Sequence, residues 1–169
     1  MSDMIYTIYG EVPELIEKKA NELVEEYLDE PKDDFNYIRY NMYEDSLNQI
    51  IEETLTMPFF SDKKVVIVQN AFVFTGEKAP KDVNPNIEGL IEFLSKYDGS
   101  TLLIFEVNHN KLDERKKLVK TLKKQANLIK IEQMSEKEMK NWIKSYLHEN
   151  YKDIKEDALN LFIELTGIN

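Results

Sequence analysis

The stretch from Thr54 to Asn70, TLTMPFFSDKKVVIVQN, constrains the fold more than any other part of this sequence. Its first residues end a predicted helix, because Pro58 disfavours helical geometry for the residue before it. Residues 64–68, KVVIV, are apolar on both faces, which is typical of a strand inside a parallel sheet. Phe59 and Phe60 lie on the short connection between helix and strand. Connections usually run over the surface, so this pair is either covered by a neighbour or offered to a partner.

Hydrophobic periodicity predicts an alternation of strands and helices around this stretch. The alternation implies right-handed crossovers and an α/β fold with a five-stranded, mostly parallel sheet and flanking helices. A long connection over residues 71–85 is expected to be functional or mobile. The predicted strands cover residues 4–9, 35–40, 64–68, 101–107 and 128–131, and the predicted helices cover 13–28, 46–55, 85–97 and 113–126.

The pattern changes near Gln133. Ser135 and Glu138 have the spacing of a capping box, and the helix that they open carries an apolar stripe that includes Trp142. A second helix over residues 158–165 stops at Gly167, and no strand follows. We therefore expect an α/β domain over residues 1–133 and the beginning of a small helical domain, truncated, over 134–169.

Composition narrows the class of protein. Of the 169 residues, 42% are hydrophobic and 32% are charged, which is ordinary for a soluble globular protein. No apolar run is long enough to cross a bilayer, and the N-terminus lacks the features of a secretory signal. The absence of cysteine excludes disulfides and thiolate zinc sites. We expect a cytoplasmic protein with no membrane partner.

The net charge of −10 is unevenly distributed. Residues 1–60 carry 15 acidic and 4 basic side chains, whereas residues 111–130 carry 8 basic and 2 acidic ones. An acidic protein is a poor general DNA binder, and the simplest interpretation of the basic segment is a solvated helix face. A DNA-binding module built on residues 111–130 remains an alternative. Its candidate contacts to DNA or a partner are Lys116, Lys117, Lys120, Lys123 and Lys124.

Ligands of such sheets normally bind at the carboxyl ends of the strands. A nucleotide site there needs glycines, a lysine and a hydroxyl after the first strand. This chain has GEVPE at residues 10–14, with one glycine and two carboxylates, and its third strand ends in Gln69-Asn70 rather than an acidic pair. We interpret this as evidence against ATP hydrolysis and expect no cofactor. A nucleotide-binding enzyme with an atypical loop is the alternative.

Other catalytic patterns are missing from the sequence. His109 and His148 lie far apart and have no metal-ligand spacing, and His109 is expected to be simply solvated. Glu106, within an apolar strand, is a candidate for a shifted pKa, but is expected near the strand exit. Trp142 is expected to pack in a core. We therefore expect no catalytic or metal-binding residues.

The segment Met57-Pro58-Phe59-Phe60 is left with two interpretations. It is either an apolar plug that closes the bottom of the sheet or staples the preceding helix, or a hydrophobic wedge that enters a partner's pocket. Two adjacent aromatic side chains can supply several kcal/mol when both become buried, which is enough to anchor a small interface.

Several segments, in their order and spacing, resemble the delta-subunit family of the bacterial DNA polymerase III clamp loader. Each segment alone is weak, but together they cover essentially the whole chain and make the resemblance fairly specific. The segments are YGEVPELIEK (9–18), TMPFFSDKKVVIV (56–68), NKLDERKKL (110–118), MSEKEMKNWIKSYLHEN (134–150) and EDALNLFIELTG (156–167).

The resemblance implies an AAA+-like fold with a degenerate phosphate loop that no longer binds ATP. It implies a non-enzymatic subunit that binds and opens the sliding clamp, the beta subunit, during DNA replication, while the polymerase activity resides in another subunit. The clamp contact would be Phe59 and Phe60, with Met57 and Pro58 beside them.

The resemblance also implies which parts of the loader this sequence contains. Residues 134–169 would begin the second, lid domain, and the collar domain that assembles the loader would be absent. Contacts with the tau/gamma and delta prime subunits would then lie mostly in missing parts, and DNA would be met only indirectly.

Overall fold

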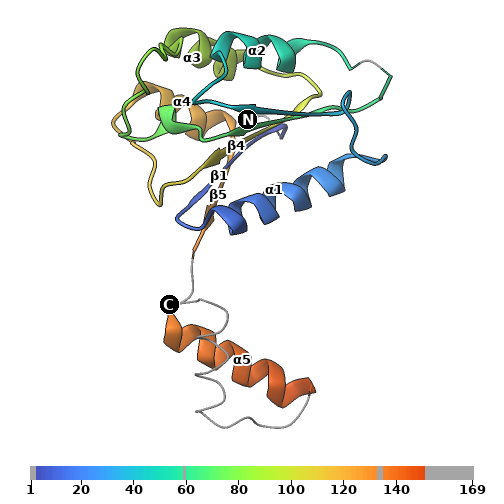
Figure 1. Cartoon of the computed structure of the whole chain (residues 1–169), viewed down its shortest axis with the longest axis vertical. Helices are drawn as coiled ribbons and strands as arrows, with labels where there is room; N and C mark the ends of the chain where they lie inside the picture. Colours follow the sequence, from blue (N-terminus) through green and yellow to red (C-terminus); the bar gives the residue numbers. More distant parts are fainter. Residues whose placement is uncertain (1–2, 59, 133–134, 151–169) are drawn as a thin grey trace. The chain divides into compact units, whose positions relative to one another are not determined.

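The computed structural model describes residues 3–58, 60–132 and 135–150. The chain divides into two compact units, Met1–Ile131 and Glu132–Asn169. The larger unit holds the sheet and the smaller unit is helical in its described part (Figure 1).

The larger unit is a parallel α/β domain. Its five strands pair in the order β2-β3-β4-β1-β5, and every neighbouring pair is parallel. This arrangement confirms the fold class expected from the sequence. The elements in chain order are β1 (Ile5–Gly10), α1 (Pro13–Tyr27), β2 (Tyr37–Asn41), α2 (Leu47–Leu55), β3 (Val65–Gln69), the short 3-10 helix η1 (Phe72–Phe74), α3 (Ile87–Lys96), β4 (Leu102–Val107), α4 (Lys117–Gln125) and β5 (Asn127–Ile131).

Helices cover both faces of the sheet, as Figure 1 shows. On one face, α1 buries Ile16, Ala20 and Val24 against Ile67 and Ile104 of the central strands. The other face packs against α2, α3 and α4 and forms the larger core. Because β3 and β4 lie between two helical layers, nearly every one of their residues is buried, as the continuous apolar run predicted.

A short polar side chain begins α2, and a proline begins α1. The hydroxyl of Ser46 accepts a hydrogen bond from the Asn48 amide (3.2 Å), so Ser46 caps α2. The carboxylate of Asp45, the residue before this cap, accepts the Asn41 amide at 2.8 Å. Pro13 opens α1, where its missing N–H is not needed.

The starts of β2 and α4 were predicted too early. Strand β2 begins at Tyr37, because the Asp33 carboxylate accepts the amides of Phe35 and Asn36 and folds this segment into a turn. Helix α4 begins at Lys117 rather than Asp113, because residues 113–116 form a turn in which the Asp113 carboxylate accepts the Arg115 amide (3.2 Å).

The connection over residues 71–85 is not a surface loop throughout. Its first part forms η1, whose three residues are buried in the larger core. Phe74 packs edge-on against Phe105 of β4, with ring centroids 4.9 Å apart. This first part is therefore a structured element of the core, whereas whether the connection is functional or mobile stays a prediction.

The smaller unit contains α5 (Glu136–Asn150) among its described residues. Ser135 caps it by accepting the Glu138 amide at 3.1 Å, which confirms that half of the predicted capping box. Trp142 and Tyr146 are about half exposed and stack on each other, so the prediction that Trp142 packs in a core was wrong. The second predicted helix, 158–165, lies outside the described residues. None of the helices in the described part of the chain is long and apolar enough to cross a membrane.

Candidate partner-binding site

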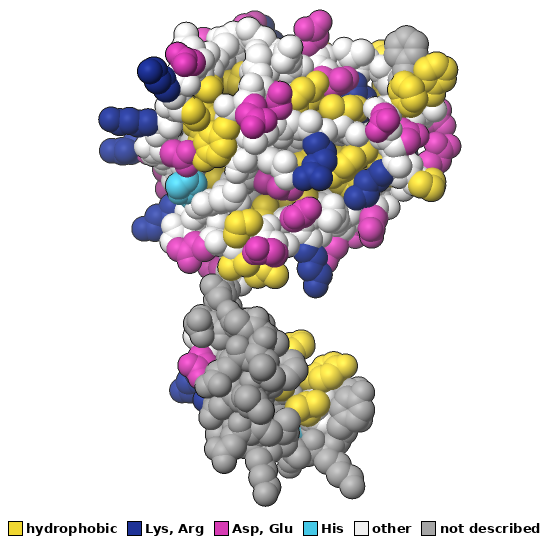
Figure 2. Space-filling model, viewed as in Figure 1, with side chains coloured by type: hydrophobic (Ala, Val, Ile, Leu, Met, Phe, Trp, Pro, Cys, Tyr) yellow, Lys and Arg dark blue, Asp and Glu magenta, His cyan; other side chains and the backbone are white. Residues whose placement is uncertain are grey.

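Large apolar side chains gather at the amino-terminal edge of the sheet, around the connection from α2 to β3. We call Phe35, Leu55, Met57 and Phe60 the apolar tip; their exposed fractions are 52%, 61%, 78% and 83%. Figure 2 shows hydrophobic side chains clustered at one corner of the larger unit. Met57 and Phe60 are therefore not part of a core, which argues against the plug interpretation. Pro58 is half-buried, and Phe59 lies outside the described residues.

Sheet pairing explains why the apolar tip draws on two distant segments. Strands β2 and β3 are parallel neighbours in which Tyr37 lies opposite Val65. Phe35 comes just before β2 and Phe60 shortly before β3, so both leave the sheet at the same edge. Their rings meet edge to face, with centroids 5.1 Å apart and planes at 66°.

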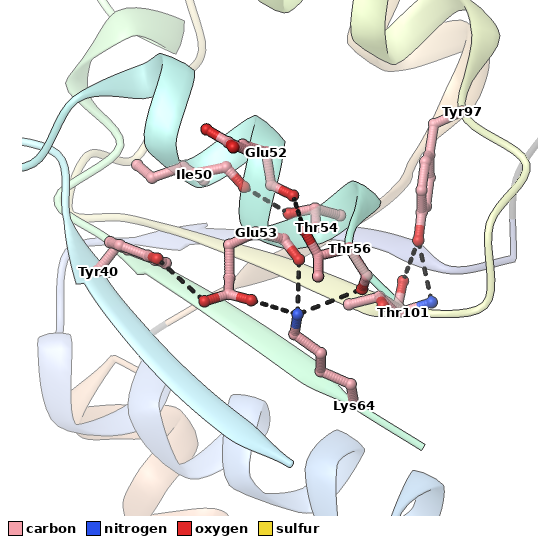
Figure 3. Close-up of polar contacts among 9 residues, drawn as sticks. All are labelled: Tyr40, Ile50, Glu52, Glu53, Thr54, Thr56, Lys64, Tyr97 and Thr101. Carbon is pink, nitrogen blue, oxygen red and sulfur yellow. Dashed lines mark hydrogen bonds and ion pairs between the residues drawn. The ribbon is translucent and has the colours of Figure 1, made fainter. Parts of the chain in front are cut away.

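A buried lysine fixes the base of the connection, which we call the tip loop (residues 57–63). The Lys64 side chain is only 3% exposed, and its ammonium pairs with the Glu53 carboxylate. The same ammonium donates to the backbone carbonyl oxygens of Glu53 (2.7 Å) and Thr56 (3.3 Å), as Figure 3 shows. The last carbonyls of a helix have no partner within the helix and favour a positive charge. Lys64, which follows the tip loop, is thus hydrogen-bonded to Thr56, which precedes the loop.

Hydroxyl groups reinforce the end of α2. Thr54 and Thr56 donate to the carbonyl oxygens of Ile50 (2.8 Å) and Glu52 (2.7 Å), each one turn back along the helix. The Tyr40 hydroxyl approaches the Glu53 carboxylate at 3.4 Å (Figure 3). The helix ends at Leu55, where the predicted range of residues 46–55 also ends.

The backbone of the tip loop is held in an unfavourable conformation at Phe60, which is 83% exposed. Phe60 has φ 57°, in the left-handed region, which costs an L-residue other than glycine on the order of 1–2 kcal/mol. Beside it, the Ser61 hydroxyl donates to the Lys63 carbonyl oxygen (2.8 Å), and the Lys63 ammonium pairs with Asp29 at 3.1 Å. Strain of this kind gathers at functional sites, where the surrounding structure maintains it.

The opposite edge of the sheet is polar. Asn41, Asn70 and Asn108 follow β2, β3 and β4, and their amide groups bind one another: Asn108 Nδ2 donates to Asn70 Oδ1 (3.0 Å), and Asn70 Nδ2 donates to Asn41 Oδ1 (3.1 Å). These are the positions where the sequence analysis expected ligand chemistry. The amides form a neutral chain, so they offer little charge for a ligand.

A second polar group at this edge joins three connections. Glu77 accepts the Tyr43 hydroxyl at 2.5 Å and contacts His109 Nε2 at 2.8 Å. Burial, followed by the hydrogen bond to Glu77, raises the pKa of Tyr43 to about 12. That same hydrogen bond is the main cause that lowers the pKa of Glu77. His109 is thus exposed but paired, rather than simply solvated as predicted. In the described part of the chain, no group of three or more potential ligands is placed to hold a metal ion.

The turn between β1 and α1 contains only Glu11 and Val12. A phosphate loop needs a longer, glycine-rich connection whose amides surround the phosphates. Gly10 has a different structural reason: a Cβ atom there would lie 2.6 Å from the carbonyl oxygen of Ile131 on β5. This turn therefore gives no support for a nucleotide site.

Glu106 is the one buried carboxylate on β4, with 8% exposure. Burial is the main cause that raises its pKa, the nearby Glu17 adds to the rise, and Arg39 and a hydrogen bond with Gln69 oppose it. Burial within the sheet accounts for this shift, so the raised pKa by itself does not indicate a catalytic role.

The five candidate lysines of the basic segment do not form one surface. Lys116 donates to the Val73 carbonyl oxygen (3.2 Å), and Lys123 pairs with the Glu114 carboxylate. The remaining three, at helical spacing on α4, are exposed, and no salt bridge between described residues includes them: Lys117, Lys120 and Lys124.

The sequence of this chain matches a protein-family model and a curated relative. A family model described as "DNA polymerase III, delta subunit" matches residues 6–132. The DNA polymerase III subunit delta of Bacillus subtilis is 29% identical over 163 residues, which are 96% of this chain and 47% of the relative. The chain thus spans about half the length of the curated relative that it matches.

One solved structure resembles this chain closely enough to support its fold. A structure of the Bacillus subtilis DNA clamp loader delta protein matches with a TM-score of 0.77 and 28% identity, covering 96% of this chain and 48% of that one. This likeness supports the predicted AAA+-like fold. Domain III of the Thermotoga maritima replication initiation protein DnaA matches with a TM-score of 0.46 and 18% identity, covering 93% of this chain and 66% of that one.

Proposed function

Because this chain belongs to the delta-subunit family of DNA polymerase III, we propose that it binds the replicative sliding clamp through Met57, Pro58, Phe59 and Phe60 of the tip loop and helps to open the ring. The observation that carries the proposal is the tip itself. Met57 and Phe60 are the two most exposed large apolar side chains among the described residues, and both lie on a loop fixed at its base by Lys64.

Such a tip suits insertion into an apolar pocket. Binding energy at protein interfaces concentrates in a few aromatic and large apolar side chains that become fully buried. A loop that is ordered before binding loses less conformational entropy on docking than a disordered loop does. The lysine contact and the turn at Ser61 supply this order before any partner arrives.

The proposed mechanism is mechanical and involves no covalent step. The tip stabilises a clamp conformation in which one subunit interface is strained, so binding shifts the ring towards its open state. We propose that ATP is used by neighbouring loader subunits and not by this chain. The two-residue turn between β1 and α1 supports this part of the proposal.

The test is binding to the cognate sliding clamp by isothermal titration calorimetry. We expect Phe59→Ala/Phe60→Ala to weaken binding by about 100-fold or more, the loss expected when two anchor residues are truncated. The matched control is Trp142→Ala, which removes an exposed aromatic ring from the other unit and should leave the affinity unchanged. Equal affinities for the wild type and the double variant would refute the proposed site.

The exposed lysines of α4 support a second, weaker contact. Lys117, Lys120 and Lys124 have the i, i+3, i+7 spacing of one helix face. We propose that this stripe approaches the DNA phosphates that the clamp encircles. Lys116 and Lys123 are excluded from the proposed contact because each already has an internal partner.

A further inference from the structure

Phe35 lies beside the proposed clamp-binding loop but comes from a different part of the chain. Its ring contacts Phe60 edge to face at 5.1 Å, and about half of its surface remains exposed. It belongs to the connection between α1 and β2, which neither the family resemblance nor the wedge prediction included. Phe35 is thus an exposed aromatic ring in contact with a second exposed aromatic ring, Phe60.

The support beneath Phe35 is rigid. The Asp33 carboxylate accepts the Phe35 amide at 2.8 Å, and the Asp33 amide donates to the Asn36 side chain at 2.8 Å. Asn36 is fully buried, and its carbonyl oxygen accepts the Val65 amide of β3 at 2.8 Å. The Phe35 backbone is thus tied, through its neighbour Asn36, to the strand that follows the tip loop.

The tip loop is fastened to the same connection at a second point. The Lys63 ammonium pairs with Asp29 and lies over the Tyr27 ring, 5.1 Å from its centroid. These contacts hold the carboxyl-terminal end of the loop. Phe60, whose φ of 57° is unfavourable, precedes this end by three residues. The ring of Phe60 contacts the ring of Phe35, which comes from outside the loop.

We propose that Phe35 is a positioning residue for the clamp contact: its ring holds Phe60 in the orientation that enters the clamp. This inference rests on the proposed function. An edge-to-face pair fixes the direction of both rings, because the positive edge of one ring meets the negative face of the other. Phe60 then reaches the pocket already ordered, and less of its freedom is lost on binding.

The experiment is a double-mutant cycle for clamp affinity with Phe35→Ala, Phe60→Ala and both together. We expect Phe35→Ala to weaken binding by about 3- to 10-fold, the range that corresponds to one aromatic pair. In the Phe60→Ala background the same change should have no further effect, and Phe35→Tyr, which keeps the ring, should bind like the wild type.

Two results would overturn the inference. Unchanged affinity in Phe35→Ala would show that Phe60 needs no support, while the proposed tip would stand if Phe60→Ala still weakened binding. An equal loss with and without Phe60 would make Phe35 an independent contact. Failure of the wild type to bind the clamp would instead refute the proposed function.

A measurement without the clamp keeps the inference testable in that case. We expect the NMR order parameter of the Phe60 amide to fall towards the flexible range, below about 0.6, in Phe35→Ala and to stay near the rigid value in the wild type. Order parameters for Val66 in β3 should not change, because that residue lies in the core. Identical order parameters at Phe60 in both proteins would contradict the inference.

Discussion

The carboxyl and amino edges of the sheet differ in the polarity and exposure of the side chains beside them. At the carboxyl edge, where ligands of parallel sheets usually bind, Asn41, Asn70 and Asn108 satisfy one another. At the amino edge, Met57 and Phe60 stand largely exposed on a strained loop. Parallel sheets usually bind ligands at the carboxyl edge. Here the asparagines at that edge bind one another, and exposed apolar side chains lie at the amino edge.

Exposure of an apolar side chain does not by itself mark the candidate site. The site combines exposed apolar side chains with a loop whose base is held by hydrogen bonds. Trp142 is also exposed, but its described contact is a stack with Tyr146 on its own helix. The tip loop is instead held by Lys64, the residue just before β3. The Lys64 ammonium donates to the backbone carbonyl oxygens at the end of α2. The predictions below test this contrast between the edges, from the largest effect to the smallest.

Lys64→Met should destabilise the larger unit by about 3 kcal/mol, because it leaves helix-end carbonyls and the Glu53 carboxylate without their buried partner. Urea unfolding monitored by circular dichroism measures this. Lys63→Met is the matched control: Lys63 is a neighbouring lysine whose ion pair is at the surface, so the cost should stay below about 1 kcal/mol. Equal costs for the two variants would show that Lys64 does not fix the loop.

Met57→Lys should weaken clamp binding by about 10-fold or more, because a lysine must lose its hydration to enter an apolar pocket. Stability should change by less than about 0.5 kcal/mol, since Met57 is 78% exposed. Leu15→Lys, on the exposed face of α1, is the comparison and should leave the affinity intact. Calorimetric titration of the clamp with each variant measures the affinity. If both variants bind like the wild type, the amino edge is not the contact.

Glu106→Gln should stabilise the protein slightly, and only above acidic pH. Burial raises the pKa of Glu106 above its ordinary value of 4.5, so the folded state holds this proton more tightly than the unfolded state does. Stability is therefore lost as the pH rises from about 4.5 through the folded pKa, and the glutamine variant avoids this loss. Thermal unfolding of both proteins across this range gives the difference. A gain that is equally large at pH 3 would contradict this explanation.

Replacing Lys117, Lys120 and Lys124 together with alanine should have the smallest effect. Weak binding of the chain to DNA should fall further and depend less on salt, because each lost phosphate contact removes about 0.9 from the salt slope on duplex DNA. Fluorescence anisotropy with a labelled duplex at several salt concentrations measures the slope. Clamp affinity in the absence of DNA should not change. An unaltered salt slope would remove α4 from the proposal.

Much of the fold could be predicted because hydrophobic periodicity carries it. The continuous run in β3 and the stripes of α1 and α2 placed these elements to within a few residues. The turn around Phe35 was missed because its cause is polar: Asp33 and Asn36 bind each other's backbone amides. The spacing of those two residues was the available signal.

The candidate site was predictable only in part. Pro58 marked the end of a helix, and the apolar residues beside it marked a possible contact, but exposure depends on which strands become neighbours. The burial of Lys64 could have been predicted from strand geometry, because successive side chains of a strand point to opposite faces. Lys64 therefore shares a face with Val66 and Val68, and that face packs against α2. The pairing of Phe35 with Phe60 had no such signal, because it follows from the adjacency of β2 and β3.

The most direct test of the central claim is a hydrogen-exchange map of this chain with and without the sliding clamp. Binding through the apolar tip predicts slower exchange over residues 55–63 and over the turn at 33–36, with no change around Asn41, Asn70 and Asn108. Protection at those three asparagines, with the tip loop unchanged, would contradict the account and return the binding site to the carboxyl edge of the sheet.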